Sequence, residues 1–147
     1  MTVTRREVMT IGATALALHA VRVGFAGAAE TAAPAPEPRT GLADAAAGCV
    51  AVGDACLQHC LDLLGKGDTS LAECSESVRQ KLAVCSAVGP LADAGSKHLK
   101  DAARLCVAVC SDCEGACRKH ENHHAACKRC ADACARTIAE AKKVLDA

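Results

Sequence analysis

The positions of apolar and polar residues after Leu42 predict helices and no strand. No run in this region alternates with the two-residue period of a strand, and Ala, Leu, Glu, Lys and Arg dominate it. Turn-forming residues interrupt it at residues 65–68, 89–96 and 119–122. Because short connections favour antiparallel neighbours, we predict an all-α protein, an antiparallel up-down-up-down four-helix bundle. The expected helices cover residues 42–64, 69–88, 97–118 and 123–145.

The first residues have the pattern of an export signal. Arg5 and Arg6 stand just before an apolar stretch over residues 8–21, and small residues at 26–28 form a cleavage site. The stretch is too short and too rich in alanine for a comfortable membrane span. We predict a twin-arginine-type signal peptide over residues 1–28 and an exported, periplasmic protein. A Sec-type signal or a membrane anchor is the alternative.

A linker rich in proline and alanine follows over residues 29–41 and leads into a domain over residues 42–147. Its three prolines, Pro34, Pro36 and Pro38, favour an extended and solvated chain. Both methionines, Met1 and Met9, lie in the signal. The mature protein is therefore expected to have no thioether ligand.

The composition limits both the packing of the domain and its partners. The chain has one Phe, no Tyr and no Trp, so its core must pack with small side chains. Its 17 basic residues match its 17 acidic residues, and we expect no nucleic-acid partner and, after signal cleavage, no membrane partner. No nucleophile with a base and an orienting group is recognisable, and no phosphate loop, so we expect no enzymatic activity.

The spacing of the cysteines is the most informative feature of the domain. All twelve lie after residue 48, and three pairs are eleven residues apart: Cys49 and Cys60, Cys74 and Cys85, and Cys106 and Cys117. His123 and Cys134 have the same spacing. On a helix, eleven steps of about 100° return to within about 20° of the starting direction. Each helix therefore carries a stripe of thiols, and the four stripes turn inward to form a cysteine-lined core.

The candidate metal ligands are the twelve thiols and one histidine: Cys49, Cys56, Cys60, Cys74, Cys85, Cys106, Cys110, Cys113, Cys117, Cys127, Cys130, Cys134 and His123. Antiparallel packing predicts that they form layers. One end layer holds Cys60, Cys74 and Cys117 with His123 or Cys127, and the other holds Cys49, Cys85, Cys106 and Cys134. The middle holds Cys56, Cys110, Cys113 and Cys130.

Several chemistries fit inward thiols. Cysteine can be a small core residue, but packing would not require it at nearly every inward position. A disulfide within one helix would be strained, because i and i+4 Cβ atoms lie about 5 to 6 Å apart and a disulfide needs about 3.5 to 4.5 Å. Disulfides between helices stay possible. The pairs Cys110/Cys113 and Cys127/Cys130 resemble zinc knuckles, so zinc or an iron–sulfur cluster is a further alternative. A thiol oxidoreductase would need one exposed cysteine of low pKa.

Charge favours copper over zinc in such a core. A zinc ion with four thiolates carries a net charge of about −2, and several such sites would bury many negative charges. A Cu(I) ion replaces one thiol proton, so the core stays nearly neutral at every stage of loading. Soft thiolates also prefer the soft Cu(I) ion. These properties favour a store for multiple Cu(I) ions per chain.

Three motifs resemble the bacterial copper storage proteins: the run from Cys49 to Cys60, Cys-x3-Cys-x2-Cys-x3-Cys at residues 106–117, and Cys-x2-Cys-x3-Cys at residues 127–134. The resemblance covers residues 42–147. It implies a four-helix bundle that stores Cu(I) in copper homeostasis, all twelve cysteines as ligands, and a homotetramer. In exported members it also implies a twin-arginine signal. Some relatives have Met and His near the mouth of the bundle, and without Met the mature chain would use histidine there.

A few polar residues stand near the stripes. Lys81 lies about 20° from the line through Cys74 and Cys85, so we expect its side chain to snorkel out of the core. Three histidines cluster at the start of the fourth expected helix, and two others point away from the stripes and are expected at the surface. The cluster is His120, His123 and His124, and the surface pair is His59 and His98.

Overall fold

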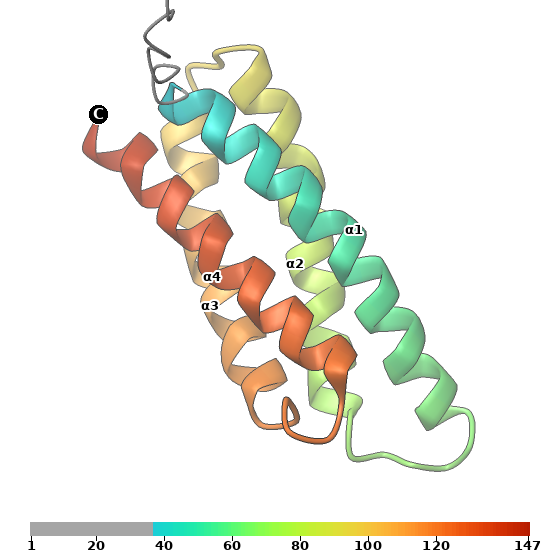
Figure 1. Cartoon of the computed structure of the whole chain (residues 1–147). Coiled ribbons are helices and arrows are strands. Elements are labelled where there is room, and N and C mark those ends of the chain that lie inside the picture. Colours follow the sequence, from blue (N-terminus) through green and yellow to red (C-terminus); the bar gives the residue numbers. More distant parts are fainter. Residues whose placement is uncertain (1–36) are drawn as a thin grey trace, which may run out of the picture. The chain divides into compact units, whose positions relative to one another are not determined.

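The computed structural model describes residues 37–147, and these residues form four helices and no strand. They are α1 (Pro38–Leu64), α2 (Ala72–Asp93), α3 (Leu99–Arg118) and α4 (Ala125–Asp146). Each helix packs against the next, and α4 also packs against α1. Figure 1 shows that successive helices run in opposite directions. The predicted up-down-up-down bundle is confirmed. The predicted signal peptide and most of the linker lie outside the described residues.

Helix α1 begins at Pro38, four residues before the predicted start and inside the predicted linker. Proline is favoured in the first turn of a helix, because its missing N–H would have no partner there and its φ already suits the helix. Leu42, in the next turn, is fully buried. By length and composition α1 could cross a membrane, as core helices of soluble proteins also can. Here α1 packs against α2 and α4.

Helix α2 continues through Pro90 to Asp93, so the prediction that it ends at residue 88 was wrong. Proline lacks the N–H that would bond to the Ser86 carbonyl, but Ser86 and Pro90 are both exposed, and water can satisfy that carbonyl. Gly89 has no Cβ to clash with the proline ring. Val88 and Ala92 are buried and continue the inward face across the proline. Packing on both sides of Pro90 therefore holds the helix together.

The two ends of the bundle are closed by different side chains. Where α1 begins and α4 ends, the buried residues are mostly aliphatic, and they include Leu42, Val88, Leu99 and Val144. Where α1 ends and α4 begins, the buried residues are mostly thiols, namely Cys60, Cys74, Cys117 and Cys127, with Leu71 beside them. Fully burying a Leu or Val side chain contributes roughly 1.5–3 kcal/mol to folding. The aliphatic end therefore supplies stability, and the thiols extend to the other end.

Candidate metal centre

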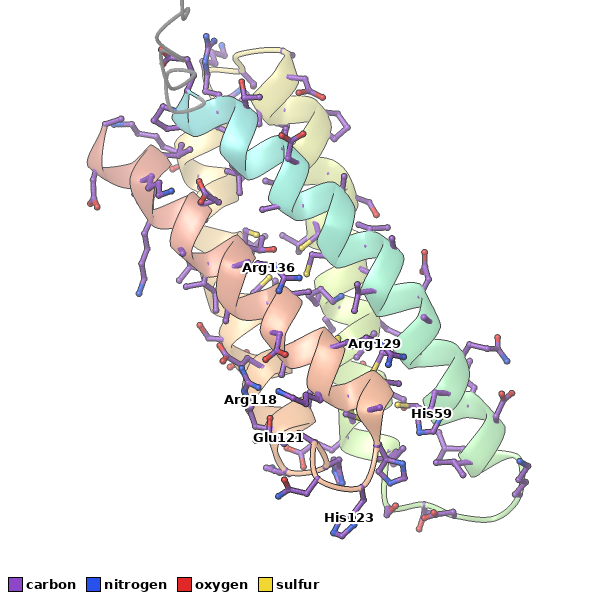
Figure 2. The ribbon with its side chains drawn as sticks, in the orientation of Figure 1. His59, Arg118, Glu121, His123, Arg129 and Arg136 are labelled. Atoms are coloured by element: carbon purple, nitrogen blue, oxygen red, sulfur yellow. The ribbon has the colours of Figure 1, made fainter. Side chains whose placement is uncertain are left out.

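All twelve cysteines lie in the interior of the bundle. Each is at most 1% exposed, and each is a free thiol. Figure 2 shows their sulfur atoms between the helices. On α3 the cysteines occupy positions 106, 110, 113 and 117, which is the i, i+4, i+7, i+11 pattern of one helical face. The prediction of a cysteine-lined core is confirmed.

The thiols form five groups in which all sulfur atoms lie within 4.8 Å of one another. One group has four members, Cys56, Cys60, Cys74 and Cys127. The others have three: Cys49, Cys110 and Cys134; Cys56, Cys117 and Cys130; Cys85, Cys106 and Cys110; and Cys113, Cys130 and Cys134. Four cysteines belong to two groups each, namely Cys56, Cys110, Cys130 and Cys134. We call these twelve residues the thiol column. Because neighbouring groups share cysteines, the column is nearly continuous.

The sulfur separations suit metal ions bound between neighbouring thiolates. The Sγ atom of Cys74 lies 3.2 Å from the Sγ atom of Cys117 and 3.9 Å from that of Cys127. At the other end, the Sγ atoms of Cys85 and Cys110 are 3.7 Å apart. A metal–sulfur bond of about 2.3 Å places two thiolates at most about 4.6 Å apart across one ion. The thiols are therefore close enough to bind ions with small movements of their side chains.

Neighbouring thiols change one another's pKa. Hydrogen bonding with Cys117 lowers the pKa of Cys74 to about 4, and hydrogen bonding with Cys110 lowers the pKa of Cys106 to about 4. Hydrogen bonding with Cys106 in turn raises the pKa of Cys85 above its ordinary value. Some thiols in the column thus give up a proton easily while others hold theirs. A metal ion must displace such protons to bind, because thiolate is the ligand.

The predicted layers agree with the thiol groups only in part. Cys60, Cys74 and Cys127 lie together at one end, and Cys85 and Cys106 lie together at the other, as predicted. Cys56 and Cys110 were predicted in the middle but join these two end groups, because each lies one helical turn from a cysteine of the end layer on its own helix. His123 does not join them. Helix α4 begins at Ala125, so the helical spacing that placed His123 on the stripe does not apply, and His123 is exposed in the turn before the helix (Figure 2).

Two other histidines meet at the thiol end of the bundle. His59 Nε2 on α1 lies 3.0 Å from His124 Nδ1, and both rings are partly buried. The His120 ring lies 6.3 Å from the His124 ring, centroid to centroid. The prediction of a surface position was confirmed for His98, which is exposed, but was wrong for His59. Because α1 ends where α4 begins, antiparallel topology was the signal that could have paired His59 with His124.

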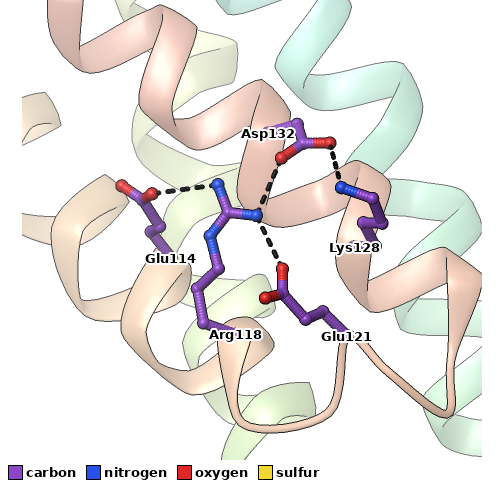
Figure 3. A network of polar contacts seen from close by, with 5 residues as sticks. All are labelled: Glu114, Arg118, Glu121, Lys128 and Asp132. Carbon is purple, nitrogen blue, oxygen red and sulfur yellow. Dashed lines mark hydrogen bonds and ion pairs between the residues drawn. The ribbon is translucent and has the colours of Figure 1, made fainter.

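A polar network fixes the turn that carries these histidines (Figure 3). Arg118, at the end of α3, donates hydrogen bonds to Glu121 at 2.7 Å and to Asp132 on α4 at 2.8 Å. It also pairs with Glu114 at 3.2 Å. Hydrogen bonding with Arg118 lowers the pKa of Asp132 below its ordinary value. Arg118 therefore joins α3, the turn and α4 next to the histidines.

Lys81 is buried in the core, so the prediction that it snorkels to the surface was wrong. Its side chain is 0% exposed, and its Nζ donates a hydrogen bond to the Cys49 carbonyl oxygen on α1 at 2.8 Å. Gly53 on α1 makes this possible, because a Cβ at that position would contact Lys81 Nζ and lie 2.8 Å from Leu82 Cδ2. The signal was in the sequence: positions 81 and 53 fall on the inward stripes of their helices.

We expect Gly53→Ala to lower the free energy of unfolding by about 1–3 kcal/mol, because the added methyl group overpacks the core against Lys81. The matched control is Gly48→Ala on the same helix, where a Cβ would meet nothing within 4 Å. It should raise stability by roughly 0.5–1 kcal/mol through helix propensity alone. Urea unfolding of the two variants measures the difference. If the two substitutions changed the free energy of unfolding equally, Lys81 would not need the space that Gly53 leaves.

The sequence of the bundle matches the model of a known protein family. The sequence profile of the copper storage proteins, Csp, matches residues 36–146. The chain belongs to the copper storage protein family. A search of curated proteins gave no match. This match confirms the resemblance seen in the cysteine motifs, and membership of the family implies copper storage. The buried thiol groups of this copper storage protein fit thiolate binding of copper.

Proposed function

We propose that this protein takes up multiple Cu(I) ions per chain and stores them as thiolate complexes inside the bundle. The observation that carries the proposal is the sharing of cysteines between thiol groups. A structural site needs one closed group of four ligands, whereas shared ligands suit a series of neighbouring ions. Family membership supports copper as the metal.

Charge supports the oxidation state. Cu(I) replaces thiol protons one for one, so the buried column stays close to neutral as it fills. Zinc in every group would leave excess thiolate charge in a core from which water is excluded, and such charge is strongly destabilising. The soft thiolate ligand also favours Cu(I). Zinc in the group of four thiols is the rival, and it predicts a much smaller load.

Anaerobic titration of the reduced protein with Cu(I), against a competing chelator, tests the proposal. We expect uptake of about as many ions as the chain has cysteines, twelve. A parallel titration with zinc is the control, and zinc should bind in smaller number and be displaced by Cu(I). Uptake that stops at one or two Cu(I) ions would reject the storage function.

We further propose that copper enters the thiol column at the end closed by His59 and His124. The opposite end is closed by aliphatic side chains, which offer no ligand to a passing ion. Imidazole nitrogen is a ligand for copper, and His59 is followed directly by Cys60 of the end group. Replacing His59 and His124 together by alanine should slow Cu(I) transfer from a chelator about tenfold or more. The final load should not change. Unchanged transfer rates would place the route elsewhere.

Export and assembly complete the proposal. The twin arginine at Arg5 and Arg6 supports transport to the periplasm in the folded state, with the thiols already buried. Replacing both arginines by lysine should keep the protein in the cytoplasm, as fractionation and immunoblotting would reveal. Secretion at the normal level would favour a Sec-type signal.

The homotetramer is proposed from the family resemblance, and sedimentation equilibrium tests it.

A further inference from the structure

The five thiol groups follow one another in a single line, because each group shares one cysteine with the next. The line starts with the group of four thiols at the histidine end of the bundle, where His59 and His124 meet. From there the shared residues are, in order, Cys56, Cys130, Cys134 and Cys110. Within residues 37–147, no group shares members with more than two others. An ion that moves along the column therefore meets the shared cysteines one after another.

Cys134 forms one of the boundaries between groups. Its group on the histidine side also contains Cys113 and Cys130, and its group on the other side also contains Cys49 and Cys110. Beyond this boundary lie four thiols, which we call the far thiols: Cys49, Cys85, Cys106 and Cys110. Among the described residues, the thiol groups connect these four to the rest of the column through Cys134 alone.

The other boundaries between groups are each crossed by a second pair of neighbouring thiols. Near the histidine end, the Sγ atoms of Cys74 and Cys117 are 3.2 Å apart. Cys117 and Cys113 lie one turn apart on α3 and connect the next two groups. Among the far thiols, Cys49 hydrogen bonds with Cys85. Within residues 37–147, an ion therefore has one way across the boundary at the shared thiol of α4 and two ways across each of the others.

Helices α1 and α2 explain why the column narrows at this boundary. On α2, Cys74 and Cys85 are eleven residues apart, and Lys81 occupies the inward stripe between them. On α1, the inward position facing it is Gly53, and Lys81 Nζ donates a hydrogen bond to the Cys49 carbonyl oxygen at 2.8 Å. The lysine side chain thus fills the place where further sulfur atoms could have bridged the two parts of the column. This follows from the space that the side chain fills and does not depend on its charge.

We propose that Cys134 is the transfer ligand through which Cu(I) ions pass between the two parts of the store. This inference rests on the proposed function, with copper entry at the histidine end. During transfer the ion keeps its bond to the Cys134 sulfur while its bonds to the group on the histidine side are replaced by bonds to Cys49 and Cys110. The proton that leaves a receiving thiol is balanced by one that a released thiolate takes up, and copper stays Cu(I). The retained bond matters because a bare ion in the low-dielectric core would be strongly destabilised.

The time course of anaerobic Cu(I) transfer from a chelator to the reduced apo protein tests this role in Cys134→Ala. The matched control is Cys49→Ala, which removes one thiol from the same group and keeps the link from Cys134 to Cys110. We expect the wild type and the control to fill without a separate slow phase. In Cys134→Ala the far thiols are four of the eleven that remain when one of the twelve is removed, so about a third of the uptake should become at least about tenfold slower. Removal of copper from the loaded variant by a chelator should show a slow fraction of the same size.

Loading by a second route separates transfer from capacity. When Cu(I) is added to the variants in urea and the chain is then refolded, ions reach the far thiols without crossing the boundary. Cys134→Ala and Cys49→Ala should then hold the same load to within about one ion. A load of Cys134→Ala that is several ions lower by both routes would indicate lost binding sites and overturn the transfer role. If Cys134→Ala does not fold, Cys134→Ser provides the same comparison, because a hydroxyl is a poor ligand for the soft Cu(I) ion.

The outcomes separate this inference from the storage function. A wild-type load of one or two ions would overturn both. A wild-type load of about twelve, with no slow phase in Cys134→Ala, would leave the store intact and overturn the transfer role. The far thiols would then fill by a route of their own, such as the groove between α1 and α2 that Cys85 lines. A slow phase of equal size in Cys49→Ala would also contradict the role, since that variant keeps the shared thiol.

Discussion

Replacing the four shared cysteines together by alanine should reduce the Cu(I) load to about half of the wild-type value or less, because thiolates hold the ions in groups. These cysteines are Cys56, Cys110, Cys130 and Cys134, and each belongs to two thiol groups. Without them, one group of three thiols survives, Cys60, Cys74 and Cys127. The loss should therefore exceed the four ligands removed. Anaerobic Cu(I) titration of the variant measures it.

A second variant removes the same number of thiols and keeps the shared ones. Its substitutions to alanine are at Cys49, Cys60, Cys85 and Cys113, each of which belongs to one group. We expect it to lose about four ions, one for each thiolate removed. Circular dichroism confirms that both variants keep their helices. Equal losses in the two variants would mean that the thiols bind copper independently and that the shared positions have no special role.

Loading with Cu(I) should raise the midpoint of thermal unfolding by more than about 20 °C. A ligand at about 1,000 times its Kd adds about 4 kcal/mol of stability, and several ions act together. In a domain of about 100 residues, each kcal/mol shifts the midpoint by about 4–8 °C. Anaerobic melting of the reduced apo and loaded proteins, followed by circular dichroism at the helix band, gives the shift. An unchanged midpoint would place the copper outside the folded core.

The apo protein should keep its helices at room temperature. Leu42, Leu71, Val78 and Val88 are fully buried and pack without any metal ion. A small structural zinc protein would instead unfold when its metal is removed. The circular dichroism spectrum of the reduced, chelator-treated protein distinguishes the two. A random-coil spectrum would indicate that metal is a structural requirement and would contradict a store that is filled and emptied.

The fold and the thiol column could be predicted from the sequence because both follow from periodicity. The spacing of Cys106 and Cys117 fixes one helical face whatever the other helices do. The end of α2 could not be predicted in this way. Proline was taken as a stop signal, but the buried Val88 and Ala92 on either side of Pro90 outweighed the missing hydrogen bond.

Contacts between helices were the part that periodicity left out. Lys81 was expected to reach solvent because lysine rarely stays buried, and only the absent side chain at Gly53, on another helix, gives it an interior position. His59 was assigned to the surface from its own helix alone, whereas its partner His124 stands 65 residues later in the sequence, just before α4. The prediction that His123 lies on the thiol stripe was wrong for a local reason, because α4 begins two residues after it.

The central claim is that copper is stored among the twelve buried thiols, and anomalous diffraction at the copper absorption edge tests it most directly. Crystals of the Cu(I)-loaded protein should show a row of copper peaks along the axis of the bundle. Each should lie about 2.3 Å from cysteine sulfur atoms. Copper found only at the histidines or on the surface, with no peak between the four cysteine stripes, would contradict the account.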